Sequence, residues 1–121
     1  MKQIKQLARS LSHAMRGIKE VYKTENSFKI QVFVGLVIAI AAFWLPLEAW
    51  ERVVVLMLVG FVLIMELINS VFERLVDSFR SRVHPVVRDI KDIMAAAVLL
   101  ASLFAAIVGL IIFIPYIIDF I

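Results

Sequence analysis

Three long runs of apolar residues without a single charge constrain the fold of this chain more than any other feature. They cover residues 32–47, 53–65 and 93–114. With its flanking residues, each run reaches across a hydrocarbon core about 30 Å thick at a rise of about 1.5 Å per residue. A soluble domain of 121 residues has too little interior for a composition that is 63% hydrophobic. The pattern predicts an all-α membrane protein with three transmembrane helices.

The chain has the length of a single domain, residues 1–121, and we expect its spans at about 28–48, 52–77 and 92–115. Pro46 is expected to end the first helix and Pro115 the third, because proline disrupts the helical hydrogen-bond ladder. The polar stretch 78–92 then connects the second span to the third.

Apolar side chains recur three and four residues apart over residues 3–23, which is the period of an amphipathic helix. They are Ile4, Leu7, Leu11, Ala14, Ile18 and Val21. The basic side chains lie mostly on other faces, so we expect this helix to lie along a membrane surface rather than cross the bilayer. The alternative, a packed helix of a soluble domain, lacks a soluble segment to pack against.

The basic residues are distributed unequally between the two sides of the predicted spans. Of 13 lysines and arginines, seven precede the first span and five lie between residues 74 and 91, whereas Arg52 lies alone in the other connection. The positive-inside rule therefore places the N-terminus in the cytoplasm and the C-terminus outside. Because the basic residues flank apolar runs, the net charge of +3 indicates contact with lipid headgroups rather than with nucleic acid.

A polar stripe follows the second apolar run. Glu66, Asn69, Ser70, Glu73 and Asp77 fall within about 100° of one another on a helix. Glu66 is expected some 10 Å below the cytoplasmic boundary, a depth at which an ionisable group normally marks a functional site. The structural alternative is a carboxyl that only forms hydrogen bonds between helices.

The residue types of this stripe suit phosphate chemistry with a hard cation. Carboxylates favour Mg²⁺, which one or two of them hold together with substrate phosphates, and a poorly hydrated carboxylate suits a general base. Lys91 lies between Asp89 and Asp92 at the start of the third span, where it can meet phosphates or simply be solvated. No glycine-rich phosphate loop is present, and with two histidines and no cysteine we do not expect a metal site built from histidine. A proton-coupled transporter and a structural membrane subunit are the rival functions.

The segment Glu66-Leu-Ile-Asn69-Ser70-Val-Phe-Glu73 resembles the signature of the prokaryotic diacylglycerol kinase family, which includes undecaprenol kinases. Arg16-Gly17-Ile-Lys19 through Thr24-Glu25, and Lys91-Asp92 before the alanines, resemble it too, and the likeness runs from about residue 12 to residue 110. It implies a homotrimer in a prokaryotic plasma membrane. Its composite sites would transfer the γ-phosphate of MgATP to a lipid alcohol at the cytoplasmic surface.

The resemblance also implies roles for single positions. Glu66 matches the general base, with Asn69 beside it, and Glu25 and Glu73 match the carboxylates that hold Mg²⁺ with the nucleotide. Lys91 matches a phosphate-binding lysine, and Asp92 and His84 match residues that contact the nucleotide. Trp44 and Arg52 match positions on the lipid side of the site. Gln31, Ala95 and His13 replace the carboxylate, serine and tyrosine usual in diacylglycerol kinases, while His84-Pro85 is more similar to undecaprenol kinases. Gln31 and Arg52 offer hydrogen-bond donors for ester carbonyls, whereas Ala95 lacks the donor that a serine would give. The size of the diacylglycerol kinase family then favours diacylglycerol as the expected acceptor, with undecaprenol as the alternative.

Small residues recur at intervals of four along the third span, at Ala97, Ala101, Ala105 and Gly109. Small side chains let helix backbones approach closely, so we expect this face to pack on another helix. One chain with three spans would not easily enclose Glu66, and this too favours an oligomer.

Overall fold

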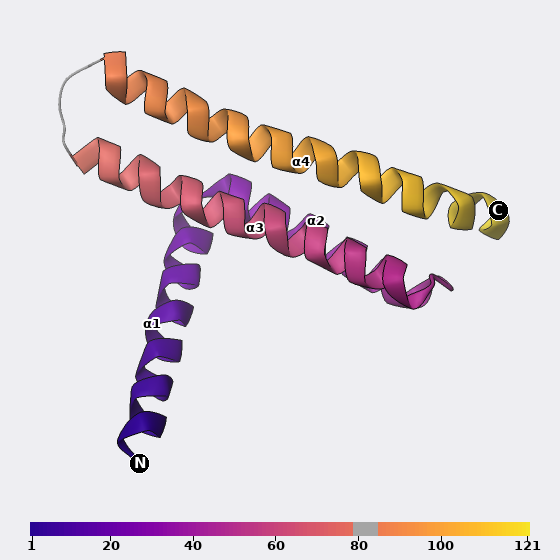
Figure 1. Ribbon diagram of the computed structural model, residues 1–121, viewed down its shortest axis with the longest axis horizontal. Helices are drawn as coiled ribbons and strands as arrows, with labels where there is room; N and C mark the ends of the chain where they lie inside the picture. The colour runs from indigo at the N-terminus through magenta and orange to yellow at the C-terminus, as the bar shows by residue number, and fades with distance from the viewer. Residues whose placement is uncertain (79–84) are drawn as a thin grey trace.

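The computed structural model describes residues 1–78 and 85–121, and these form four helices (Figure 1). The helices are α1 (Lys2–Thr24), α2 (Asn26–Trp44), α3 (Ala49–Ser78) and α4 (Pro85–Phe120). No strand occurs in these two segments. The prediction of an all-α protein is confirmed. His84 lies outside the described residues.

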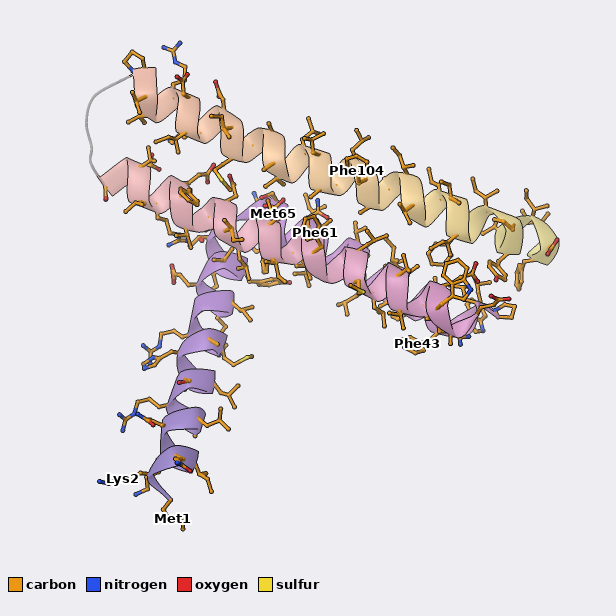
Figure 2. The ribbon with its side chains drawn as sticks, viewed as in Figure 1. Met1, Lys2, Phe43, Phe61, Met65 and Phe104 are labelled. Carbon is orange, nitrogen blue, oxygen red and sulfur yellow. The ribbon has the colours of Figure 1, made fainter. Side chains whose placement is uncertain are left out.

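Helix α1 stands off from the other helices at a steep angle, and its N-terminal end lies far from them (Figure 1). Met1 and Lys2 mark this free end in Figure 2. No residue of α1 is buried, and its apolar side chains, among them Leu7 and Leu11, are exposed along the helix. The amphipathic helix expected over residues 3–23 is therefore present, with an apolar face available to a membrane surface.

Two short breaks separate the first three helices. Glu25 alone divides α1 from α2 and has an extended backbone with φ −122° and ψ 116°. Leu45 ends α2 in an extended conformation, as expected for a residue that precedes proline. The break at Glu25 turns α2 away from α1, and the break at Leu45 turns the chain back so that α3 packs along α2.

Helix α3 is the centre of the bundle, because the backbones of α2 and α4 both run close beside it and not beside each other. Gly35 lets α2 approach α3 closely, since a Cβ atom at this position would lie 2.8 Å from Cγ1 of Val59. A cavity of about 490 Å³ lies between α2, α3 and α4. Its lining is apolar apart from Gln31 on α2 and Ser102 on α4.

Helices α2, α3 and α4 are each long and apolar enough to cross a membrane. Large apolar side chains on their outer faces are exposed, among them Phe104 on α4, which is labelled in Figure 2. Such a surface suits lipid rather than water. The prediction of three membrane-spanning helices is confirmed.

Helix α4 differs at both ends from the span expected at about 92–115. It begins at Pro85, because proline is favoured in the first turn of a helix, where its missing N–H costs nothing. It also continues through Pro115 to Phe120, so the expectation that Pro115 ends the helix is wrong. In lipid the neighbouring backbone groups must still be paired, which favours a helix on both sides of a proline.

The small-residue face of α4 is turned inward within the same chain. Ala101 is buried, and Ala105 and Gly109 line the cavity next to α3 and α2. The close helix packing expected from this face is present between α4 and α3 of one chain.

Candidate active site

The candidate site lies where the start of α2 packs against the second half of α3. Glu66 on α3 is only 5% exposed. Ser27, in the first turn of α2, donates a hydrogen bond to Oε2 of Glu66 at 3.5 Å. A single chain therefore covers this carboxyl, contrary to the expectation that one chain with three spans would not easily enclose it.

Glu25 reaches the same region from the break between α1 and α2. Its side chain does not cap α2. It extends to α3 instead, where the Ser70 hydroxyl, only 1% exposed, donates a hydrogen bond to Oε2 of Glu25. Because Ser70 lies one helical turn beyond Glu66, this contact holds Glu25 next to the carboxyl that the sequence marked as a base.

Three carboxylates share this region. Glu25 and Glu73 both lie close enough to Glu66 to interact with it electrostatically. Like charges gathered at a site of low polarity favour a cation. In the described parts of the chain, no three acidic or histidine side chains converge tightly enough to ligate one ion by themselves. One or two carboxylates that leave ligand positions for phosphate oxygens fit Mg²⁺.

Lys91 lies near the start of α4 and reaches the site on α3 from there. Its Nζ forms an ion pair with Oδ1 of Asp77 at 2.7 Å, and Glu73 adds a weaker attraction. Asp92 is exposed beside it, and Asn69 is half-buried on α3. Since 42% of the Lys91 side chain is exposed, its ammonium group remains accessible to an anionic ligand.

The sequence matches known lipid kinases over most of its length. Residues 12–113 match the family model described as prokaryotic diacylglycerol kinase. The chain belongs to this family. It is 33% identical over 107 residues to an undecaprenol kinase of Bacillus subtilis, which covers 88% of this chain and 87% of that protein. It is 30% identical over 101 residues to a diacylglycerol kinase of Escherichia coli K12, covering 84% and 83% of the two chains.

A third relative shows that the match can form part of a longer protein. The diacylglycerol kinase of Synechocystis is 36% identical over 101 residues, which are 83% of this chain and 58% of that one. The resemblance seen in the sequence is confirmed, and the chain is a member of a family of prokaryotic membrane lipid kinases.

Two residues that the family resemblance assigns to the lipid side lie at the opposite end of the bundle. Arg52 is 14 residues from Glu66 along α3, or about 21 Å. It donates hydrogen bonds to the backbone oxygens of Ala42 at 2.8 Å and Leu45 at 3.1 Å, at the end of α2. The Trp44 ring lies 6.3 Å from that of Phe120. The structure does not bring Arg52 or Trp44 together with Glu66.

Sequence reasoning missed two members of the site. Ser27 contacts Glu66, yet nothing in its local pattern distinguishes it from the polar start of an apolar run. Arg74 contacts Ser70 and Thr24, but in the sequence it is one of many basic residues near a membrane boundary. The spacing Ser70–Arg74 of one helical turn was the only available signal, because it puts both side chains on one face of α3.

Proposed function

We propose that this protein is an ATP- and Mg²⁺-dependent kinase that phosphorylates the hydroxyl of diacylglycerol to give phosphatidic acid. The observation that carries this proposal is the buried Glu66 carboxyl, held by Ser27 next to two further carboxylates at one end of an apolar bundle. Membership of a lipid kinase family supports the reaction class. The acceptor and the metal are proposals.

The apolar cavity supports a lipid acceptor. It begins at Gln31, one helical turn from Ser27, and extends along α2 and α4 toward Phe113 and Ile117. An acyl chain in this cavity would bring the hydroxyl end of the lipid to Glu66. The Gln31 amide can donate a hydrogen bond to an ester carbonyl, and a bare isoprenoid alcohol has no such carbonyl. This arrangement favours diacylglycerol.

The residues of the site divide the work of phosphoryl transfer. Glu66 accepts the proton of the lipid hydroxyl while the hydroxyl oxygen attacks the γ-phosphorus of ATP. The bond from that phosphorus to the bridging oxygen breaks, and ADP leaves with this oxygen. Glu25 and Glu73 would hold Mg²⁺, which neutralises charge on the ATP phosphates when it is bound.

The remaining residues would orient the substrates. Lys91 releases Asp77 and pairs with a phosphate oxygen of ATP instead. Asn69 orients the lipid acceptor, and Asp92 and His84 contact the nucleotide. Because ATP is available in the cytoplasm, the end of the bundle that carries Glu66 faces the cytoplasm of a prokaryotic cell, with the N-terminus on the same side. As the family resemblance implies, we propose a homotrimer as the working assembly.

Undecaprenol is the second candidate acceptor. The Bacillus subtilis relative is an undecaprenol kinase, and the match to it covers 88% of this chain. Ala95 also lacks the hydroxyl that a serine would offer to an ester. The same Glu66 chemistry serves either alcohol, so the choice depends on what surrounds the hydroxyl.

Competition between the two lipids tests the acceptor. Purified protein in vesicles that contain both lipids should show a higher kcat/KM for diacylglycerol. Gln31→Leu should reduce that value by about tenfold, because an ester carbonyl loses its donor, and leave the value for undecaprenol unchanged. A wild-type preference for undecaprenol of about tenfold or more, which is about 1.4 kcal/mol, would overturn the diacylglycerol assignment.

A further inference from the structure

Arg74 joins α1, the α1–α2 break and α3 at the edge of the candidate site. Its Nη2 donates a hydrogen bond to Oγ1 of Thr24 at 2.8 Å, and its Nε donates one to Oγ of Ser70 at 3.3 Å. Its guanidinium also lies 3.9 Å from Oε2 of Glu25 and 3.9 Å from Oε2 of Glu20. One side chain therefore contacts four residues of three neighbouring segments.

The contact with Ser70 fixes the direction of a hydroxyl proton. Ser70 has one O–H donor, and its oxygen already accepts the hydrogen bond of Arg74. Its own proton is then directed to Oε2 of Glu25. Arg74 thus acts on Glu25 through Ser70 as well as by its nearby charge.

Ser70 and Arg74 contact the same carboxylate oxygen of Glu25. Among the described residues, both the Ser70 hydroxyl and the Arg74 guanidinium approach Oε2 of Glu25. The other oxygen, Oε1, is left for a ligand. An oriented carboxylate with one oxygen occupied and one open suits a site that takes a single Mg²⁺–carboxylate bond.

Thr24 provides a second contact that ties the end of α1 to Arg74. Its hydroxyl accepts a hydrogen bond from Arg74 and donates one to the backbone oxygen of Glu20. Arg74 therefore holds the last turn of α1 immediately before Glu25. Because Glu25 is the single residue between two helices, holding Thr24 on α3 also limits how far the Glu25 backbone can move.

We propose that Arg74 is a positioning residue, which acts through Ser70 and Thr24 to hold the Glu25 carboxylate in the orientation that receives the metal–nucleotide complex. This inference rests on the proposed function, since it takes Glu25 as a metal ligand. It assigns Arg74 a role that the other cations near this membrane boundary do not share, because among the described residues Arg74 is the basic side chain that forms an ion pair with the Glu25 carboxylate.

A charge-conserving substitution distinguishes positioning from charge. The metal–nucleotide complex is an anion, so Arg74→Met is expected to weaken its binding whether Arg74 acts by its charge or by positioning Glu25. If charge alone were decisive, lysine at this position would restore binding. Arg74→Lys keeps the charge but lacks the planar fork that serves Ser70 and Thr24 together, so positioning predicts no rescue by lysine.

The test measures binding of Mn²⁺ with a non-hydrolysable ATP analogue to purified protein by electron paramagnetic resonance, alongside kinase assays. We expect Arg74→Met to weaken Mn²⁺ binding by about fivefold, and Arg74→Lys by at least as much. The Mg²⁺ concentration for half-maximal activity should rise in parallel, with kcat at saturating Mg²⁺ changing less than about twofold. Mn²⁺ binding by Arg74→Met that equals or exceeds that of wild type would overturn the proposal, as would full rescue by lysine.

Two further variants keep the result interpretable. Thr24→Val removes one anchor and leaves Arg74 in place, so it should weaken Mn²⁺ binding by about twofold even if the Arg74 variants fold poorly; unchanged binding in Thr24→Val would count against the proposal. Glu25→Gln tests the metal ligand itself. If Glu25→Gln leaves Mn²⁺ binding unchanged, the metal assignment under the proposed function is wrong; if it weakens binding and Arg74→Met does not, only the role of Arg74 is wrong.

Discussion

The two ends of the helical bundle both carry polar networks, but they use their hydrogen bonds differently. At the end where α2 turns into α3, Arg52 donates to backbone oxygens of α2, and the Tyr116 hydroxyl and the Glu48 backbone N–H both donate to Glu51. At the other end, donors from α2 and α3 converge on the carboxylates of Glu66 and Glu25.

The difference shows why polar content alone does not identify a site. The turn-end network pairs helix termini and connections, which need partners in any membrane protein. At the Glu66 end, hydroxyl groups hold the carboxylates of Glu66 and Glu25 close to one another, and Arg74 lies 3.9 Å from Glu25 at the edge of this group. Stability does not require acidic side chains to be grouped in this way, so the arrangement indicates a ligand.

The largest expected effect is on kcat, and it is tested by replacing one glutamate at each end of the bundle. Glu66→Gln should lower kcat by about 10²–10⁴-fold, because a general base is lost, while binding of Mn²⁺ and nucleotide stays nearly unchanged. Glu51→Gln is the matched control and should keep kcat within about twofold of wild type. Steady-state kinase assays in mixed micelles measure both. Near-normal turnover of Glu66→Gln would rule out its role as the base.

A second comparison concerns Glu25 and Glu73. Glu25→Gln and Glu73→Gln should each raise the Mg²⁺ concentration for half-maximal activity by about tenfold or more, since a carboxylate ligand becomes a neutral amide. Excess Mg²⁺ should restore part of the activity. Titration of activity with Mg²⁺ gives the result, and Glu48→Gln at the turn end should show no such shift. Loss of activity that excess Mg²⁺ does not reduce would argue against metal ligation.

Arg52 offers a test at the turn end, where the structure and the family resemblance suggest different roles. Arg52→Met leaves the carbonyl of Ala42 without its donor, and an unpaired carbonyl costs about 1–3 kcal/mol, whereas the carbonyl of Leu45 keeps the hydrogen bond from the Leu47 backbone N–H. The variant should therefore unfold at a lower temperature in detergent, with KM for the lipid unchanged below that transition. A raised lipid KM with unchanged thermal stability would instead support direct contact with the lipid.

The smallest expected effect concerns the ion pair between Lys91 and Asp77. Because both side chains are substantially exposed, the pair contributes little and is easily exchanged for a phosphate contact. Asp77→Asn should lower KM for ATP by about two- to threefold by freeing Lys91 for the nucleotide, with kcat unchanged. Initial rates at varied ATP measure this. An increase in KM would show that Asp77 itself assists binding of the nucleotide.

Sequence periodicity predicted the elements of this fold well, because lipid imposes simple rules. The uncharged runs and the three-to-four spacing around Leu7 and Leu11 correspond to α2, α3, α4 and α1. The angular position of Glu66 and Ser70 on one helix also placed both on the same buried face. The membrane orientation, the trimer and the roles of single residues stay predictions.

The side-chain contacts that link α1, α2 and α3 at the site could not be predicted from the sequence. The break at Glu25 contains no glycine or proline, so no local signal predicts that one residue turns α2 away from α1. Without that break, neither Ser27 nor Arg74 can be assigned to the site, since both reach it across helices. Pro115 failed as a stop signal because its effect depends on the solvent around the helix.

The most direct test of the account is the stoichiometry of phosphate transfer in sealed vesicles that contain diacylglycerol. With labelled ATP, wild-type protein should form one phosphorylated lipid for each ATP consumed, without net proton movement across the membrane. Glu66→Gln should abolish both ATP consumption and lipid phosphorylation, and Glu51→Gln should leave both intact. Proton movement without phosphorylated lipid, or equal loss of activity in the two variants, would contradict a kinase site at the Glu66 end.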